Sequence, residues 1–157
     1  MNGLFKNCFG HKVKIQLIRE SKPVKNYQIM KASDAYELVR EELETSDREI
    51  FIVVSLNTKN KVLGLDVVSI GNISASLVHP REVFKSAILL NAASIIMMHN
   101  HPSGEPEPSK DDISITNRLV NAGKLLGINV LDHVIVANKY FSFLEKGLIE
   151  HRQEGGD

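Results

Sequence analysis

Residues 94–102 read Ser94-Ile95-Ile96-Met97-Met98-His99-Asn100-His101-Pro102. The uninterrupted apolar run within this stretch is short, which indicates a strand that is buried on both faces. Two histidines and an asparagine follow it directly. We therefore expect residues 94–98 to form a buried strand that delivers His99, Asn100 and His101 at its carboxyl end.

A second apolar run lies earlier in the chain. Residues 49–56, Glu49-Ile50-Phe51-Ile52-Val53-Val54-Ser55-Leu56, are too continuously apolar for a half-exposed strand, so we expect a central strand. The polar segment 57–60 predicts a turn, and residues 62–70 predict the returning strand, with a bend at Gly64. Residues 72–78 are a candidate continuation of that strand.

Three segments have the apolar spacing of amphipathic helices. They are residues 34–44 after an N-cap at Ser33, a helix from Pro80 to about Asn91, and a helix between a cap at Ser109 and a stop at Gly127. Residues 13–17 alternate as an edge strand does, and residues 130–137 and 140–143 predict a last hairpin. This order predicts one α/β (α+β) domain in which a mixed sheet packs against helices.

The composition is that of an ordinary globular domain. The 157 residues carry 19 basic and 19 acidic side chains, so the formal net charge of +0 gives no overall field toward nucleic acid or anionic lipid. The one cysteine, Cys8, cannot form an internal disulfide, which favours a reducing cytoplasm. The longest apolar runs are far shorter than the roughly 20 residues of a membrane helix, so we expect no membrane partner.

The histidines and an aspartate form a candidate metal site. His99 and His101 lie two residues apart in an extended segment, so their imidazoles project to the same side. Asp112 lies in the first turn of the third helix, and its carboxylate points back to the strand end if the proline-rich loop 102–108 folds over. Alone, Ser109-Lys110-Asp111-Asp112 also fits a capping box that serves only the helix. The conjunction of the three donors favours a metal.

Zinc held by two nitrogens and one oxygen keeps a fourth position for water, which is typical of catalytic sites. Such an ion lowers the pKa of its water to about 7 and polarises a carbonyl. A carboxylate must then carry the proton. Glu49, at the entry of the central strand, and Glu82, in the first turn of the second helix, are both candidates, and spacing alone does not choose between them. We expect His79 and His133 to be structural.

The stretch His99-Asn100-His101-Pro102-Ser103-Gly104 resembles the RadC group of the JAMM (MPN) metalloprotease-like superfamily. The metal motif of that superfamily is His-x-His-Pro, six residues, Ser, two residues, Asp, and all its fixed positions are present, with Ser109 and Asp112 as the last two. The similarity covers residues 30–148. It implies a cytidine deaminase-like mixed sheet for that domain, after an N-terminal edge strand and lead-in at residues 1–29 and before a flexible tail at residues 149–157.

The resemblance also implies roles. In this superfamily the catalytic glutamate stands between the first helix and the first core strand, a place that Glu49 occupies. His99, His101 and Asp112 would hold Zn²⁺, and Ser109 would donate to the oxyanion. We therefore expect a zinc-dependent hydrolase, a metalloprotease or isopeptidase, acting on a peptide or protein substrate. Eukaryotic relatives cut isopeptide bonds to ubiquitin, and that substrate does not carry over.

An alternative function is that of a DNA-repair-associated accessory protein whose metal site is not catalytic. Full-length RadC-like proteins carry an N-terminal helix-hairpin-helix module suited to DNA, whereas residues 1–29 predict only an edge strand and loop. Non-specific DNA binding depends on Lys and Arg that neutralise phosphates, which a net charge of +0 does not favour. Exposed strand edges leave a homodimer open.

Overall fold

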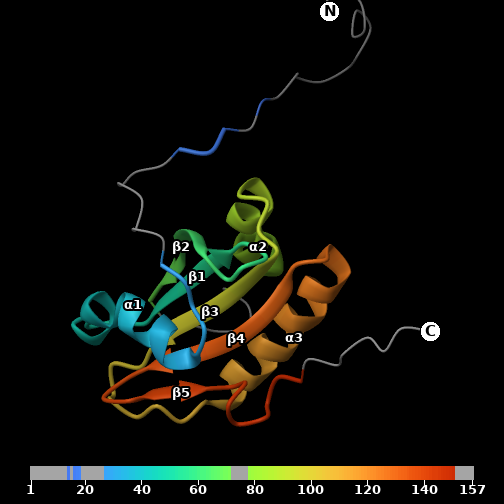
Figure 1. Cartoon of the computed structure of the whole chain (residues 1–157). Helices are drawn as coiled ribbons and strands as arrows, with labels where there is room; N and C mark the ends of the chain where they lie inside the picture. The colour runs from blue at the N-terminus through green and yellow to red at the C-terminus, as the bar shows by residue number, and fades with distance from the viewer. Residues whose placement is uncertain (1–13, 15, 19–26, 72–77, 151–157) are drawn as a thin grey trace, which may run out of the picture.

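The computed structural model describes residues 14, 16–18, 27–71 and 78–150. Five strands form one mixed sheet, and three helices accompany it (Figure 1). In chain order the elements are α1 (Ala32–Glu44), β1 (Ile50–Leu56), β2 (Val62–Ile70), α2 (Pro80–Leu89), β3 (Ser94–Asn100), α3 (Lys110–Leu126), β4 (Asn129–Val136) and β5 (Tyr140–Ser142). The prediction of a mixed sheet flanked by helices is confirmed.

The strands lie in the order β2-β1-β3-β4-β5. β1 is antiparallel to both of its neighbours, β2 and β3, and β5 is antiparallel to β4. β3 and β4 are parallel, so their connection must cross over, and α3 is that crossover. β3 therefore lies in the middle of the sheet with a partner on each side, and all of its residues are buried.

The turn between β1 and β2 follows from its asparagines. The Asn57 side-chain oxygen accepts hydrogen bonds from the backbone of Lys59 (2.9 Å) and Lys61 (3.0 Å). Asn60 adopts a left-handed backbone, with φ of 55°, which asparagine tolerates better than most residues. The strand pairing shifts register next to Gly64, where the sequence predicts a bend. The predicted turn and returning strand are both confirmed.

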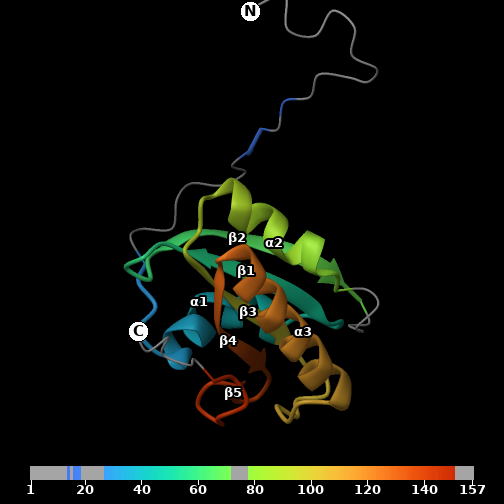
Figure 2. The ribbon, with the colours of Figure 1, turned by 90° about the vertical axis from the view of Figure 1, so that its right-hand side faces the viewer.

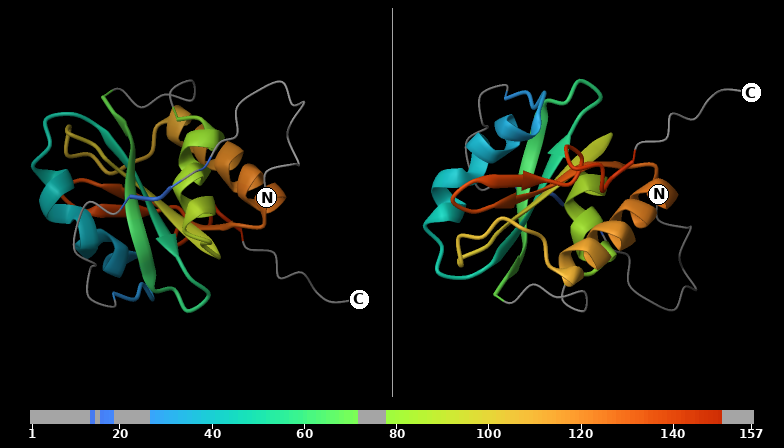
Figure 3. Two further views of the ribbon diagram at one scale, coloured as in Figure 1. Left: turned by 90° about the horizontal axis from the view of Figure 1, so that it is seen from above. Right: turned by 90° about the horizontal axis from the view of Figure 1, so that it is seen from below.

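Each face of the sheet packs on helices. On one face Phe84 of α2 and Leu119 of α3 pack in a core cluster with Met97 of β3. On the other face Leu43 of α1 packs in a second cluster with Met98. Figures 2 and 3 show α1 on one side of the strands and α2 with α3 on the other. The two consecutive methionines thus point into different layers, which explains why β3 has no polar alternation.

The prediction of an edge strand at residues 13–17 is wrong where it can be checked. Lys14, Gln16 and Leu17 form no strand, and Leu17 is 38% exposed. A period-two pattern yields a strand only where a sheet edge pairs with its backbone, and these residues have no such pairing. Residues 13 and 15 of this prediction lie outside the described residues, as do residues 72–77 of the candidate continuation of β2, which was predicted for residues 72–78.

The predicted N-cap at Ser33 is also wrong, because α1 begins two residues earlier than predicted, at Ala32, and Lys31 is its N-cap. The carboxylate of Asp34 accepts hydrogen bonds from the backbone N–H groups of Met30 (2.9 Å) and Lys31 (3.1 Å). An acidic residue at the third helical position thereby satisfies the amides at the helix start. The serine hydroxyl at position 33 is not needed as a cap.

The longest described helix, α3, has 17 residues. It ends as predicted at Gly127, whose φ of 68° is a left-handed conformation that favours glycine. Among the helices that the structure describes, none is long and apolar enough to cross a membrane.

Candidate metal centre

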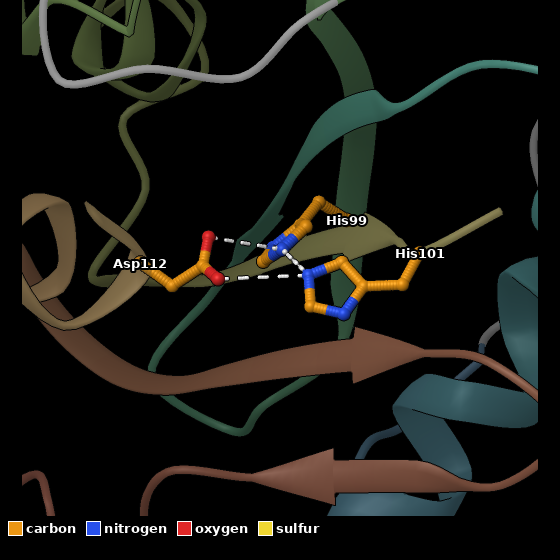
Figure 4. Close-up of side chains that lie close together, drawn as sticks. All are labelled: His99, His101 and Asp112. Atoms are coloured by element: carbon orange, nitrogen blue, oxygen red, sulfur yellow. Dashed lines mark hydrogen bonds and ion pairs between the residues drawn. The ribbon is translucent and has the colours of Figure 1, made fainter. Parts of the chain in front are cut away.

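The two histidines of the motif converge at the end of β3. His99 belongs to the strand, which runs two residues further than predicted, and His101 follows its last residue. The backbone N–H of His101 still donates to Val136 in β4, at 2.9 Å, so the chain remains extended there. Residues two apart on an extended chain share a face. The Nε2 atoms of His99 and His101 accordingly lie 3.0 Å apart (Figure 4).

Asp112 completes the cluster from the first turn of α3. Its Oδ1 lies 3.2 Å from Nε2 of His99, and its Oδ2 lies 3.5 Å from Nε2 of His101. Asp112 is 4% exposed and His99 is 1% exposed. One ligand atom from each of the three residues lies within 4.8 Å of the others, so the group could hold a metal ion. The structure thus brings together the three residues that the sequence predicts as ligands.

The capping box at the start of α3 also forms, and it orients the same carboxylate. The hydroxyl of Ser109 accepts from the backbone N–H of Asp112 (3.1 Å), while Oδ2 of Asp112 accepts from the backbone N–H of Ser109 (2.7 Å). The Ser109 hydroxyl in addition donates to Oδ2 at 2.6 Å. The capping role and the ligand role are therefore compatible, because the cap holds the carboxylate facing the histidines.

The loop between β3 and α3 sets the tautomer of His101. Nδ1 of His101 lies 2.7 Å from the carbonyl oxygen of Glu105. A carbonyl can only accept, so Nδ1 carries the hydrogen and donates it. In a neutral imidazole this leaves the lone pair on Nε2, the nitrogen that faces His99 and Asp112. The proline-rich loop thus presents His101 in the form that binds metals.

A buried chain of hydrogen bonds sets the tautomer of His99. Nδ1 of His99 lies 2.8 Å from Nε2 of His133, and Nδ1 of His133 lies 2.6 Å from the Thr116 hydroxyl. That hydroxyl donates to the backbone carbonyl of Asp112, at 2.6 Å. Because the hydroxyl hydrogen is used in this bond, the Thr116 oxygen accepts from Nδ1 of His133. Nε2 of His133 then has no hydrogen and accepts from Nδ1 of His99. The direction of every hydrogen bond in the chain is thereby set, and Nε2 of His99 keeps its lone pair.

The donor set fits zinc. Atoms bound to one tetrahedral zinc at about 2.0–2.2 Å lie about 3.4 Å from one another. The two imidazole nitrogens lie 3.0 Å apart, and Oδ1 of Asp112 lies 3.2 Å from Nε2 of His99, both near that spacing. The 3.5 Å contact with His101 is made by the other carboxylate oxygen, Oδ2. Two imidazoles and one carboxylate are also a ligand mix that catalytic zinc sites use. The cluster therefore has the donor chemistry of a three-ligand site, and its ligand atoms are close enough to converge on one ion.

The electrostatics of the cluster follow from burial and pairing. Burial alone would raise the pKa of Asp112, but the His101 and His99 rings, whose Nε2 atoms donate to the carboxylate when the rings are protonated, outweigh it and hold that pKa well below its ordinary value. The hydrogen bond to Asp112 raises the pKa of His101 against the effect of burial, and the charge of Glu49 acts in the same direction. Burial lowers the pKa of His133 well below its ordinary value, so its ring is neutral, as the chain requires.

The two candidate carboxylates lie in different surroundings. Glu49 directly precedes β1, is half-buried, and is close enough to raise the pKa of His101. Phe51 pairs with His99 as the last pair of the β1–β3 ladder, so Glu49, two residues before Phe51, lies just beyond the end of β3 that carries the histidines. Glu82, in contrast, pairs on α2 with Lys85 and with Arg81. The hydrogen bond from Lys85 lowers the pKa of Glu82.

Three residues at the site were not assigned a role from the sequence: His133, Thr116 and Asn100. His133 was expected to be structural, whereas it contacts His99 directly. Its partners lie 34 and 17 residues away in the chain, so no local spacing could reveal the contacts. The available signal was the Leu131-Asp132-His133 segment, which belongs to the stretch that resembles RadC proteins.

Comparison with known proteins agrees with this geometry. The profile of the family described as RadC-like JAB domain matches residues 29–148. A UPF0758 protein of Desulfitobacterium hafniense is 52% identical over 130 residues, covering 82% of this chain and 57% of the relative. A UPF0758 protein of Methanosarcina mazei is 48% identical over 124 residues, covering 78% of this chain and 54% of the relative.

A third relative, the UPF0758 protein of Desulforamulus reducens, is 54% identical over 117 residues and is matched over 52% of its length. The chain therefore spans about half the length of these curated relatives. Residues 29–148, which the family profile matches, contain β3, α3 and the His-His-Asp cluster. The chain belongs to the family of RadC-like JAB domains.

Proposed function

We propose that this protein is a zinc-dependent hydrolase that cleaves amide bonds, either peptide or isopeptide, in a protein substrate. The observation that carries the proposal is the convergence of His99, His101 and Asp112, whose ligand atoms lie within 4.8 Å of one another. Second contacts hold each ligand in its metal-binding form. Such pre-orientation is typical of functional metal sites. The single cysteine fits a cytoplasmic location.

In this proposal Glu49 is the general base and then the general acid. Zinc, when bound by the three ligands, supplies a Lewis acid that polarises the scissile carbonyl and a water of lowered pKa. Glu49 takes a proton from the attacking water and gives it to the leaving amine, as a carboxylate beside the metal does. Its place next to the end of the β1–β3 ladder and its effect on the pKa of His101 support this role.

Ser109 is the proposed donor to the oxyanion. It is exposed at the start of α3, where an incoming substrate can reach its hydroxyl. The hydroxyl now donates to Oδ2 of Asp112 and accepts from the backbone of the same residue. When the carbonyl oxygen of the substrate gains negative charge, the hydroxyl can turn its hydrogen to that oxygen while it still caps the helix. Preorganised donors of this kind stabilise the transition state.

The experiment that tests the function compares the wild type with Glu49→Gln. Both proteins, loaded with zinc, are incubated with a proteome-derived peptide and protein mixture, and new amino termini and released lysine side chains are detected by mass spectrometry. The wild type should generate new amino groups. Glu49→Gln should generate about a hundredfold to ten-thousandfold fewer, because one proton-transfer group is lost, while its zinc content stays the same.

Glu82→Gln is the matched control, because it removes the other candidate carboxylate, which pairs with Lys85 on α2. This variant should cleave as the wild type does. Equal cleavage by the wild type and by Glu49→Gln would contradict the role of Glu49, and a wild type without any cleavage would contradict the proposed hydrolase.

A further inference from the structure

Asn100 is the buried polar residue between the two histidines of the cluster. It is the last residue of β3 and is 2% exposed. Successive residues of a strand point to opposite faces. Asn100 therefore points away from the side on which His99 and His101 meet, toward the face that α1 covers, where Met98 also packs. Its side chain is not part of the His-His-Asp cluster.

The amide of Asn100 is instead hydrogen-bonded to the backbone on both sides of Glu49. Its Oδ1 accepts from the N–H of Ile50 at 2.7 Å, and its Nδ2 donates to the carbonyl of Arg48 at 3.0 Å. These partners settle the orientation of the amide, because an N–H must face the oxygen and a carbonyl must face the nitrogen. One buried side chain thus holds two successive peptide groups, and Glu49 is the residue between them.

We call the Asn100 amide with its hydrogen bonds to Arg48 and Ile50 the Asn100 clamp. This clamp lies where the β1–β3 ladder stops. Paired residues of β1 and β3 run from Leu56 and Ser94 to Phe51 and His99, and the pairing ends there. The Asn100 side chain then supplies the next bonds in place of the backbone. On the other side of β1, the N–H of Gly71 donates to the carbonyl of Glu49 at 2.8 Å. The backbone of Glu49 is therefore tied to both neighbouring strands.

We propose that Asn100 is a positioning residue: by clamping Arg48 and Ile50, it fixes the backbone of Glu49 so that this carboxylate reaches the metal centre. The proposal rests on the proposed function insofar as Glu49 acts as the base. Since His99, Asn100 and His101 are consecutive, one short segment presents two ligands to the metal and, from its opposite face, sets the place of the carboxylate. The distance between ligands and base is then fixed by β3 itself.

The variant that tests this is Asn100→Leu, which has a similar shape and lacks both hydrogen-bonding groups. The full zinc-loaded chain is studied by ¹⁵N relaxation and amide hydrogen exchange. In the wild type, the amides of Glu49 and Ile50 should have order parameters of about 0.85, the value of a rigid backbone. In Asn100→Leu they should fall below about 0.6, and exchange at Ile50 should become faster, while zinc content remains at the wild-type level.

Turnover supplies the second readout. A misplacement of about 1 Å can lower a rate by a hundredfold, so Asn100→Leu should lower kcat about a hundredfold with little change in KM. In a Glu49→Gln background the same substitution should cause no further loss, because its effect passes through Glu49. A merely structural role would lower activity in both backgrounds alike.

Two further variants keep the outcome clear. Asn129→Leu makes the same change at an exposed site in β4 and should leave both readouts unchanged. If Asn100→Leu does not fold, Asn100→Ala removes the same bonds without adding bulk. An ordered Glu49 in the folded variant, or additive losses in the two backgrounds, would overturn the proposal. Loss of order at Glu49 in a protein without hydrolytic activity would support the clamp and contradict only the proposed function.

Discussion

Nε2 of His133 lies 2.8 Å from Nδ1 of His99, and both rings are buried. This contact joins β4 to β3 beside the metal centre, and it directs the other nitrogen of His99 toward His101 and Asp112. The sheet therefore contributes more to the site than β3, the strand that carries the ligand His99. It also contributes the partner that fixes the orientation and tautomer of a ligand.

Replacement of His133 should weaken metal binding. In His133→Phe the ring shape is retained beside Phe143, but the hydrogen bonds to His99 and Thr116 are lost. Loss of such an outer contact typically lowers metal affinity about 10- to 100-fold. Competition with a zinc chelator measures the effect. His79→Gln, at the N-cap of α2, is the control and should bind zinc as the wild type does. Equal zinc affinity in His133→Phe would contradict the prediction.

Ser109→Ala should affect both the helix and the proposed reaction. Loss of the cap should lower the free energy of unfolding by about 1 kcal/mol, and loss of the oxyanion donor should lower kcat by about a hundredfold or more. Chemical denaturation and steady-state kinetics measure the two effects separately. Ser109→Thr keeps a hydroxyl and should recover most of both. A kcat that is unchanged in Ser109→Ala would show that the hydroxyl only caps α3.

The sequence predicted most of the site because its signals are local. Two-residue spacing on a strand places His99 and His101 together. The capping box orients Asp112 on its helix, but Asp112 joins the histidines only because loop 102–108 brings the start of α3 to the end of β3. Asn100 and His133 act through partners 17 to 52 residues away in the chain, which only the tertiary fold brings close. The errors at residues 13–17 and at Ser33 have different origins. The period-two pattern of residues 14, 16 and 17 met no sheet edge, and at the start of α1 the carboxylate of Asp34 took the capping role instead of Ser33.

Zinc binding should strengthen as the pH rises from about 6 to 8. The pKa of His101 is raised in the folded chain, so its protonated form stabilises the metal-free protein below the ordinary value of about 6.5. That contribution is lost as the pH rises through the folded pKa. Zinc requires the neutral ring, so the increase in Tm on adding zinc should be larger at pH 8 than at pH 6. A zinc-induced shift that is the same at both pH values would contradict this.

Low pH should destabilise the metal-free protein through Asp112. The pKa of Asp112 is lowered in the folded chain, so its ionised form contributes stability above the ordinary value of about 3.9, and this is lost as the pH falls through the folded pKa. Urea denaturation between pH 3 and 6 should show the loss in the wild type. Asp112→Asn should show a weaker dependence on pH. Parallel curves for the two proteins would refute the assignment.

Gly123 should tolerate no side chain. A Cβ at this position of α3 would lie 2.5 Å from the backbone oxygen of Ile128 and 3.2 Å from the ring of Phe84. Gly123→Ala should therefore destabilise the fold by about 1–3 kcal/mol, measured by thermal denaturation. At Gly64 an added Cβ meets only the end of the Leu90 side chain, at 3.1 Å, so Gly64→Ala is the matched control and should be milder. Equal effects would contradict the packing described.

The central claim is that His99, His101 and Asp112 share one cation, and the zinc content of the purified protein tests it most directly. Elemental analysis should find about one zinc per chain in the wild type. His101→Ala and Asp112→Ala should each abolish that content while circular dichroism shows that the fold remains. Full zinc content in both variants would contradict the site.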